Sequence, residues 1–212
     1  DRPIVRSGGI ALFISFIVPA LIFANVLNIN NQSTYIFLGG SSIFFLIGII
    51  DDFFNISPYI KLFLQLIFTS ILFYLGIKIF GVDLSGLLFT KSIIYFPETV
   101  SIILTILWIV GITNSINWID GLDGLASGTV VIYAIGILLI SIISNQNEII
   151  IISSSLLGAN LGFLKKNFHP AKILMGDSGS YFLGYTLAVL ALEIGKEDTL
   201  YIFSFKAILL LA

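Results

Sequence analysis

The sequence predicts an all-α membrane protein, a polytopic helix bundle with about eight transmembrane segments in its 212 residues. Hydrophobic residues make up 58% of the chain, charged residues only 10%, and the mean hydropathy is +1.08. Soluble domains are instead about 45–50% apolar and about 25% charged. Long runs of Ile, Leu and Phe are typical of membrane-spanning helices. The net charge of −2 offers no basic surface for nucleic acid, and the absence of cysteine excludes disulfides and thiolate metal sites.

Eight apolar segments follow one another along the chain, and a spanning helix needs about 20 apolar residues. They run approximately over 9–28, 33–50, 59–80, 99–113, 125–144, 148–164, 181–194 and from 200 onward. The fourth and seventh are short, so we expect them to extend into the polar motifs beside them. No internal repeat or separate soluble domain is visible, and a single transmembrane domain is expected over 1–212.

Alternating crossings divide the polar loops between two sides of the membrane. The side of the N-terminus receives 51–58, 114–124 and 165–180, and the other side receives 28–32, 81–98, 145–147 and 195–199. The first side carries the basic residues Arg2, Arg6, Lys61, Lys165, Lys166 and Lys172, and the second carries Lys78, Lys91 and Lys196. Basic residues favour the cytoplasmic side in short loops, which predicts that the first side is cytoplasmic.

Five aspartates need an explanation in so apolar a chain: Asp51, Asp52, Asp120, Asp123 and Asp177. An aspartate at the bilayer centre costs about 2.5–3.5 kcal/mol on insertion scales. They are therefore expected at membrane ends or in a wet cavity. The alternation of crossings places all five on the side of the N-terminus.

The first motif is the acidic doublet Asp51-Asp52, followed by Lys61 at the start of the next segment. Adjacent carboxylates repel each other unless a cation lies near, and Lys61 is placed to face them. The alternative is a plain charge pair at a helix end that anchors the topology.

The second motif contains Asn117, Asp120 and Asp123, spaced by three, with Gly121 and Gly124 between and after the acids. In a helix these side chains would share one face, although the glycines also allow a broken helix or loop. Their hard oxygen atoms suit Mg²⁺, Mn²⁺ or Ca²⁺ rather than zinc. The alternative is a polar turn between helices with capping aspartates.

The third motif runs over 167–180 and includes Asn167, Lys172, Gly176, Asp177 and Ser178. A glycine-rich loop that enters a helix exposes backbone N–H groups, which bind phosphate well. The alternative is a capped helix start at Asp177 or Ser178. The string Gly-Asp-Ser-Gly is also found in serine proteases, but the single histidine, His169, is interpreted as a loop side chain and not as a catalytic base or ligand.

The three motifs together predict a divalent cation that bridges phosphates. They combine carboxylates, amides and lysines on one side of the membrane. Magnesium usually takes one or two protein carboxylates plus substrate phosphate oxygens. Mg²⁺, with Mn²⁺ as the other candidate, would neutralise charge as a phosphoryl group moves.

In this order the motifs resemble those of the polyprenyl-phosphate N-acetylhexosaminyl-1-phosphate transferases, a family that includes the WecA and TagO enzymes and, more distantly, MraY. The similarity extends from Pro3 to at least Leu187. Its most specific strings are 117–126 and 170–180, and 3–9 is similar to an early Pro-x-Pro-Arg-x-Gly-Gly segment, with Val5 where proline is usual. The sequence also has Asn55 where many relatives carry an acid. The resemblance implies further parts of the fold before Asp1 and after Ala212.

The resemblance implies a reaction in which a lipid phosphate attacks the β-phosphorus of a UDP-N-acetylamino sugar such as UDP-GlcNAc, and UMP leaves. This is the first membrane step of cell-envelope glycan synthesis. It further implies that Asn117 and Asp177 hold Mg²⁺, and that Asp51 and Asp52 handle the lipid phosphate. Lys61 then meets phosphate, Asp120 and Asp123 serve the nucleotide and metal site, and Asn167 lies near the uridine. Lys172, Gly176 and Ser178 complete the expected substrate contacts.

A lipid phosphate is already largely ionised at pH 7, since its second pKa lies near ~6. We therefore expect Asp52 to position groups rather than to act mainly as a base. The expected partners are a UDP-amino sugar, a polyprenyl phosphate and the membrane, with a homodimer as the assembly considered. The expected location is the inner (plasma) membrane, with the site facing the cytoplasm. An ion-coupled secondary transporter, which should carry its acids mid-helix, and a non-catalytic scaffold are the alternatives.

Overall fold

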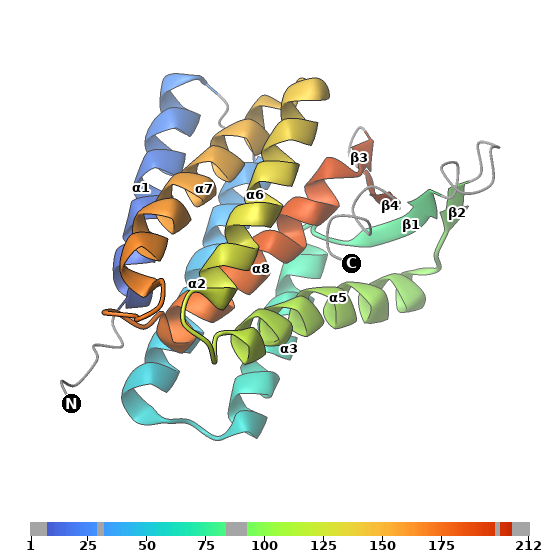
Figure 1. Cartoon of the computed structure of the whole chain (residues 1–212). Helices are drawn as coiled ribbons and strands as arrows, with labels where there is room; N and C mark the ends of the chain where they lie inside the picture. The colour runs from blue at the N-terminus through green and yellow to red at the C-terminus, as the bar shows by residue number, and fades with distance from the viewer. Residues whose placement is uncertain (1–7, 29–31, 84–92, 198–199, 205–212) are drawn as a thin grey trace.

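The structure is a computed structural model that describes residues 8–28, 32–83, 93–197 and 200–204 (Figure 1). Its helices are α1 (Gly8–Val26), α2 (Gln32–Phe54), α3 (Pro58–Tyr74), α5 (Glu98–Ile119), α6 (Leu125–Ile143), α7 (Asn147–Asn167) and α8 (Gly176–Ile194). Its strands are β1 (Ile79–Asp83), β2 (Ile93–Tyr95), β3 (Lys196–Glu197) and β4 (Leu200–Ser204). The prediction of a helical bundle is confirmed.

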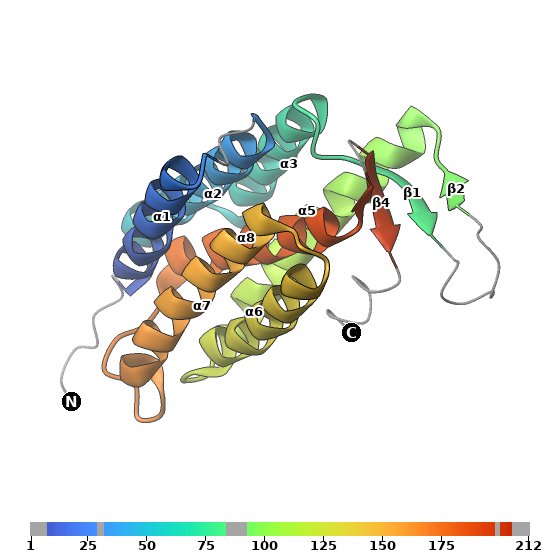
Figure 2. The same cartoon turned by 90° about the horizontal axis from the view of Figure 1, so that it is seen from above.

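Helix α8 forms the core of the bundle. In Figure 2 it runs between a row made by α1, α2 and α3 and the helices α6 and α7 on the other side. Its residues from Ser178 to Glu193 are all buried. A helix that is apolar all round is expected in an interior, and the small side chains of α8 let several neighbours approach it. With 19 residues it is about 28 Å long, close to the thickness of a bilayer core.

Within the described residues, five helices are long and apolar enough to cross a membrane, namely α1, α2, α5, α6 and α7. Helix α3 is apolar but shorter, with 17 residues. Aromatic contacts bind these helices to each other and to the core: Phe44 on α2 stacks on Tyr185 of α8 with ring centres 4.7 Å apart, and Phe13 on α1 stacks on Phe45 at 4.0 Å. The chain is a multi-pass membrane protein, although the structure does not confirm a count of eight spans.

The described residues also include a small sheet that the sequence did not predict, with strand order β2-β1-β4-β3. β1 pairs with β2 antiparallel and with β4 parallel. The eighth apolar segment, expected to begin a helix near Leu200, is therefore the strand β4 over the residues described. The third apolar segment, expected over 59–80, is also shorter than predicted, because α3 ends at Tyr74 and β1 begins at Ile79.

Side-chain hydrogen bonds attach the sheet to the N-terminal part of α5. Ser101 donates to the carbonyl oxygen of Ile79 at 2.6 Å, and the Ile79 N–H donates to Thr105 Oγ1 at 2.9 Å. These bonds satisfy the backbone N–H and carbonyl groups of Ile79, which are not in a helix. Hydropathy records only that the side chains of this stretch are apolar, so it does not distinguish the strand from the end of a helix. The sheet follows the C-terminal end of α8, so it lies at the opposite end of that helix from its aspartate (Figure 1).

Candidate active site

A short turn between α2 and α3 brings the acidic doublet next to Lys61. Asn55 adopts a left-handed conformation with φ 49° and ends α2, and Ser57 begins α3 by accepting a hydrogen bond from the Ile60 N–H. Pro58 at the first position of α3 suits a helix start. Lys61 thus lies in the first turn of α3, where its ammonium group forms an ion pair with the buried carboxylate of Asp51. The predicted pairing of Lys61 with the doublet is confirmed.

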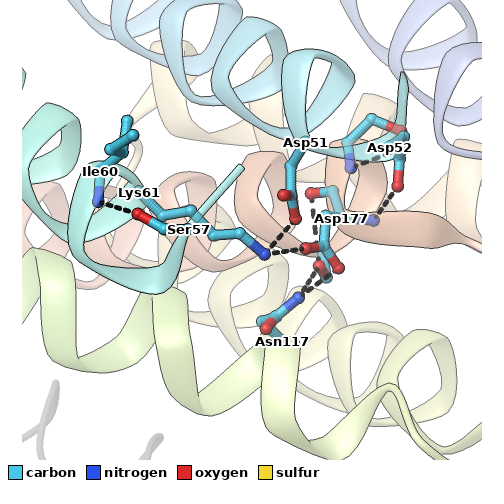
Figure 3. A network of polar contacts seen from close by, with 9 residues as sticks. Asp51, Asp52, Ser57, Ile60, Lys61, Asn117 and Asp177 are labelled. Atoms are coloured by element: carbon cyan, nitrogen blue, oxygen red, sulfur yellow. Dashed lines mark hydrogen bonds and ion pairs between the residues drawn. The ribbon is translucent and has the colours of Figure 1, made fainter. Parts of the chain in front are cut away.

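Asp177, in the first turn of α8, is contacted by residues from α2, α3 and α5 (Figure 3). Its Oδ2 lies 3.2 Å from Lys61 Nζ on α3, and its Oδ1 accepts a 2.9 Å hydrogen bond from Asn117 Nδ2 on α5. Asn117 also donates to Ser180 Oγ at 2.8 Å. Residues from three polar motifs that lie far apart in the sequence therefore meet in one place.

Asp52 contributes differently, because its carboxylate caps α8. Oδ1 accepts from the Asp177 N–H at 2.8 Å, and Oδ2 accepts from the Ser178 N–H at 3.0 Å. Gly48, one turn earlier on α2, makes this possible, since a Cβ there would collide with the backbone of Asp177 and Ser178. The alternative for this motif is a capped helix start at Asp177 or Ser178; α8 does begin there with a cap, but the capping side chain comes from α2. The first N–H groups of α8 face a carboxylate in this structure.

Asp120 caps the C-terminal end of α5 close to this cluster. Burial, together with the negative charges of Asp177 and Asp52, raises the pKa of Asp120 to about 7. A carboxyl with such a pKa can hold or release a proton near neutral pH.

Asp123 lies in the turn after α5 and is separate from the Asp177 cluster. Its Oδ2 accepts a 3.0 Å hydrogen bond from the Ala171 N–H and lies 3.0 Å from Nδ1 of the exposed His169. The hydrogen bond from Ala171, followed by the contact with His169, lowers the pKa of Asp123. The helix ends at Ile119, so Asn117, Asp120 and Asp123 do not share one helical face, and of the two alternatives the broken helix is the one found.

Asn167 ends α7 with its side chain almost completely buried. Its Oδ1 accepts from the Gly124 N–H at 3.1 Å and from Ser127 Oγ at 3.0 Å, while its Nδ2 donates to the Ile173 carbonyl oxygen at 3.0 Å. These bonds join the turn before α6 to the loop before α8. Contact of Asn167 with a uridine stays a prediction.

The remaining expected substrate contacts lie on or beside the loop that enters α8. Lys172 is exposed, Ser178 is buried, and Gly176 has φ +75°, a left-handed conformation that favours glycine. The substrate contacts of these three residues stay predictions.

The donor set around Asp177 fits a hard divalent cation. Two carboxylates, from Asp51 and Asp177, pair with the ammonium group of Lys61, and a third, from Asp52, bonds to the backbone N–H of Asp177. The buried Asp51 Oδ1 has no hydrogen-bond partner among the described residues. Asn117 would offer its Oδ1 after a half-turn of the amide, which now directs Nδ2 at Asp177. No group of three or more His, Cys, Asp or Glu among the described residues could hold a metal ion unaided. Magnesium needs only one or two carboxylates when phosphate oxygens complete its coordination.

Two polar contacts were missed by sequence reasoning. Ser180 accepts from Asn117, and Gln65 on α3 accepts a 2.7 Å hydrogen bond from Asn114 Nδ2 on α5. The signal for Gln65 was available, because it follows Lys61 by one helical turn in an apolar helix. A groove of about 550 Å³ between α1 and α7 contains none of the predicted site residues.

Comparison with known proteins identifies relatives over most of the chain. Residues 34–195 match the family described as glycosyl transferase family 4. A probable undecaprenyl-phosphate N-acetylglucosaminyl 1-phosphate transferase of Bacillus subtilis is 38% identical over 206 residues, covering 96% of this chain and 55% of the relative. A phospho-N-acetylmuramoyl-pentapeptide-transferase of Halalkalibacterium halodurans is 34% identical over 209 residues, covering 92% of this chain and 62% of the relative. The chain thus spans between half and two thirds of the length of these relatives.

Proposed function

This chain belongs to glycosyl transferase family 4, and on that premise we propose that it transfers an N-acetylamino-sugar 1-phosphate from a UDP-sugar to a polyprenyl phosphate. In the reaction an oxygen of the lipid phosphate forms a bond to the β-phosphorus of the UDP-sugar. The bond from that phosphorus to the oxygen bridging the two phosphates breaks, and UMP leaves with that oxygen. The products are UMP and a polyprenyl-diphospho-sugar. UDP-GlcNAc is the first candidate donor, in line with the name of the Bacillus subtilis relative.

The convergence of Asp51, Lys61 and Asn117 on Asp177 supports this proposal most directly. Phosphoryl transfer needs positioning and charge compensation more than covalent chemistry. Lys61 would offset the negative charge of a bound phosphate, and its ion pair with Asp51 aims it into the cluster. Asp52 keeps the start of α8 in place and so positions Asp177.

Asn117, Asp177 and Asp51 are the residues that would hold Mg²⁺ or Mn²⁺. A bound divalent cation would withdraw charge from the phosphate oxygens and make the β-phosphorus easier to attack. The excess of carboxylates over ammonium groups and the unpaired Asp51 Oδ1 support this assignment.

The position of the acids favours a transferase over a transporter. Asp51 and Asp52 lie in the last turn of α2, and Asp177 lies in the first turn of α8. A coupling-ion site of a secondary transporter is expected near the bilayer midplane.

We also propose that the site faces the cytoplasm from the plasma membrane, and that a homodimer is the assembly to examine. Lys61, Lys165, Lys166 and Lys172 lie at or near the end of the bundle where Asp177 lies, while Lys78 precedes β1 at the other end. Arg2, Arg6 and Lys91, which entered the sequence-based count, lie outside the described residues. The chain lacks cysteine, so single cysteines can be introduced at 165, on the proposed cytoplasmic side, and at 145, on the opposite side. Labelling of each by a membrane-impermeant maleimide tests the orientation.

The decisive experiment is UMP release from UDP-GlcNAc by the full chain in membranes or detergent, with a polyprenyl phosphate and Mg²⁺. We expect release that depends on the lipid and stops when EDTA removes divalent ions. A panel of other UDP-amino sugars then identifies the donor. Absence of release with every UDP-sugar, combined with proton-coupled uptake into vesicles, would contradict the proposal.

A further inference from the structure

A line of polar side chains continues from the site along one face of α3. Lys61, Gln65 and Thr69 are spaced by four, so they lie above one another on that face. Gln65 and Thr69 have no exposed surface. Polar side chains in apolar helices of membrane proteins are costly to bury and are often functional.

Gln65 meets its partner from α5. Asn114 Nδ2 donates a 2.7 Å hydrogen bond to Gln65 Oε1 and a 2.8 Å bond to the Val110 carbonyl oxygen of its own helix. Gln65 Nε2 has no partner among the described residues, so this contact is the one described hydrogen bond of the Gln65 side chain.

The position of this pair relative to the site carries the inference. Gln65 lies one turn deeper than Lys61 on α3, and Asn114 lies one turn deeper than Asn117 on α5. Lys61 contacts one carboxylate oxygen of Asp177, and Asn117 contacts the other. The helices are thus joined twice, once through Asp177 and once directly.

We propose that Gln65 and Asn114 are positioning residues that fix the rotation of α3 against α5 and so hold Lys61 and Asn117 on Asp177. The kinetic part of this proposal rests on the proposed function, whereas the structural part does not. Inside a membrane, helix packing has little hydrophobic driving force, so interhelical hydrogen bonds help to set the arrangement. The side chain of Asn117 is short, so a rotation of α5 would move its amide away from Asp177. We therefore expect the loss of the Gln65–Asn114 bond to affect metal binding most.

Four variants test the pair. Gln65→Leu and Asn114→Leu each remove one partner, and the double leucine variant removes both without leaving a buried amide unpaired. The exchange of Gln65→Asn with Asn114→Gln keeps one long and one short amide and should restore the bond. Trp108→Phe is the matched control, because it removes a 2.9 Å bond between α5 and the Ala188 carbonyl of α8 away from this pair.

In the UMP-release assay we expect each leucine variant, and the double variant, to lower kcat by roughly tenfold to a hundredfold. The Mg²⁺ concentration for half-maximal activity should rise, while the KM for the UDP-sugar changes little. The exchange variant should recover both values, and Trp108→Phe should keep the Mg²⁺ dependence of the unchanged protein. A double leucine variant with unchanged kcat and Mg²⁺ dependence would overturn the proposal.

A second measurement does not need activity. Because the chain has no cysteine, spin labels can be attached uniquely at Tyr59→Cys on α3 and Ser115→Cys on α5, both exposed positions. We expect the distance distribution between the labels to shift or broaden in the double leucine variant and to return in the exchange variant. Identical distributions in all variants would refute the positioning role. If the labels respond as expected but no UMP is released by any form, the positioning role stands and the proposed function fails.

Discussion

The carboxylate of Asp52 on α2 accepts a 2.8 Å hydrogen bond from the backbone N–H of Asp177 on α8. Its second oxygen accepts from the next N–H, of Ser178, so both oxygens are engaged. An anion at a helix N-terminus is favoured by the helix dipole and by the unpaired N–H groups there. The doublet is therefore divided: Asp51 pairs with Lys61, and Asp52 holds the helix that carries Asp177.

Replacing Asp52 should reveal this capping role. Asp52→Ala should lower the free energy of unfolding by about 0.5–2 kcal/mol, the usual value of a lost N-cap, and should reduce UMP release because Asp177 loses its position. Asp52→Asn keeps one acceptor and should have an intermediate effect on both. Thermal unfolding in detergent and the UMP assay measure the two effects. An Asp52→Asn protein with unchanged stability and no activity would instead indicate a base.

The close approach of α2 to α8 predicts opposite outcomes for two glycines of the same helix. Gly48→Ala should destabilise the protein, because the added Cβ meets the backbone of Asp177 and Ser178, which cannot move aside cheaply. Gly39→Ala is the matched control: nothing lies within 4 Å of its Cβ, so stability should rise by up to about 1 kcal/mol. Thermal unfolding of both variants checks this. Equal effects would show that the two helices do not pack as described.

Asp177→Asn should abolish UMP release while the protein stays folded. The substitution removes the charge that attracts Lys61, and it replaces an oxygen that accepts from Asn117 or that would face a cation. Size-exclusion profile and thermal unfolding should stay close to those of the unchanged chain, because the Asp52 bonds go to the backbone N–H. Retained turnover would remove Asp177 from its proposed metal-holding role.

Asp120 should make stability depend on pH. Its pKa is raised from 3.8 to about 7 by burial and by the charges of Asp177 and Asp52, so the folded state favours the protonated form. The stability linked to this proton is fully present below about pH 4 and is lost as the pH rises through 7. At about 1.4 kcal/mol per pKa unit the loss is on the order of a few kcal/mol.

The test compares the unchanged chain with Asp120→Asn between pH 5 and pH 8, without divalent ions. The variant should lose less stability over this range, since its neutral amide does not titrate. Parallel curves for the two proteins would contradict the raised pKa.

Asn167 should be required for stability as well as for any contact with substrate. Asn167→Leu leaves the Gly124 N–H, Ser127 and the Ile173 carbonyl without their partner, and an unsatisfied buried group costs about 1–3 kcal/mol. Asn25→Leu is the control, because Asn25 is exposed and its described side-chain hydrogen bond goes to Leu21 of its own helix. We expect a marked fall in melting temperature for the first variant and little change for the second. Full stability of Asn167→Leu would argue against its role as a link between the loops.

Much of the fold could be predicted from the sequence because burying polar groups in a membrane is costly. Each spanning segment must therefore be apolar by itself, and this is visible without knowledge of its neighbours. Apolar runs locate α1, α2, α5, α6 and α7, and the scarcity of charge makes each aspartate conspicuous. The same logic fails for the strands: the run at Leu200 is apolar and aromatic, and only pairing with β1 decides that its backbone is extended.

The sequence alone determined that Asp51, Asp52 and Asp177 should lie at one end of the bundle, because they follow or precede helices whose crossings alternate. Only the tertiary structure decided which atom meets which: Asp51 with Lys61, Asp52 with the N-terminus of α8, and Asn167 with a neighbouring turn. Spacing along the chain determines at which end and on which face of its own helix a residue lies. Which residue of another helix it contacts depends on helix rotation and on close approaches such as that at Gly48, and these are set by contacts between segments far apart in sequence.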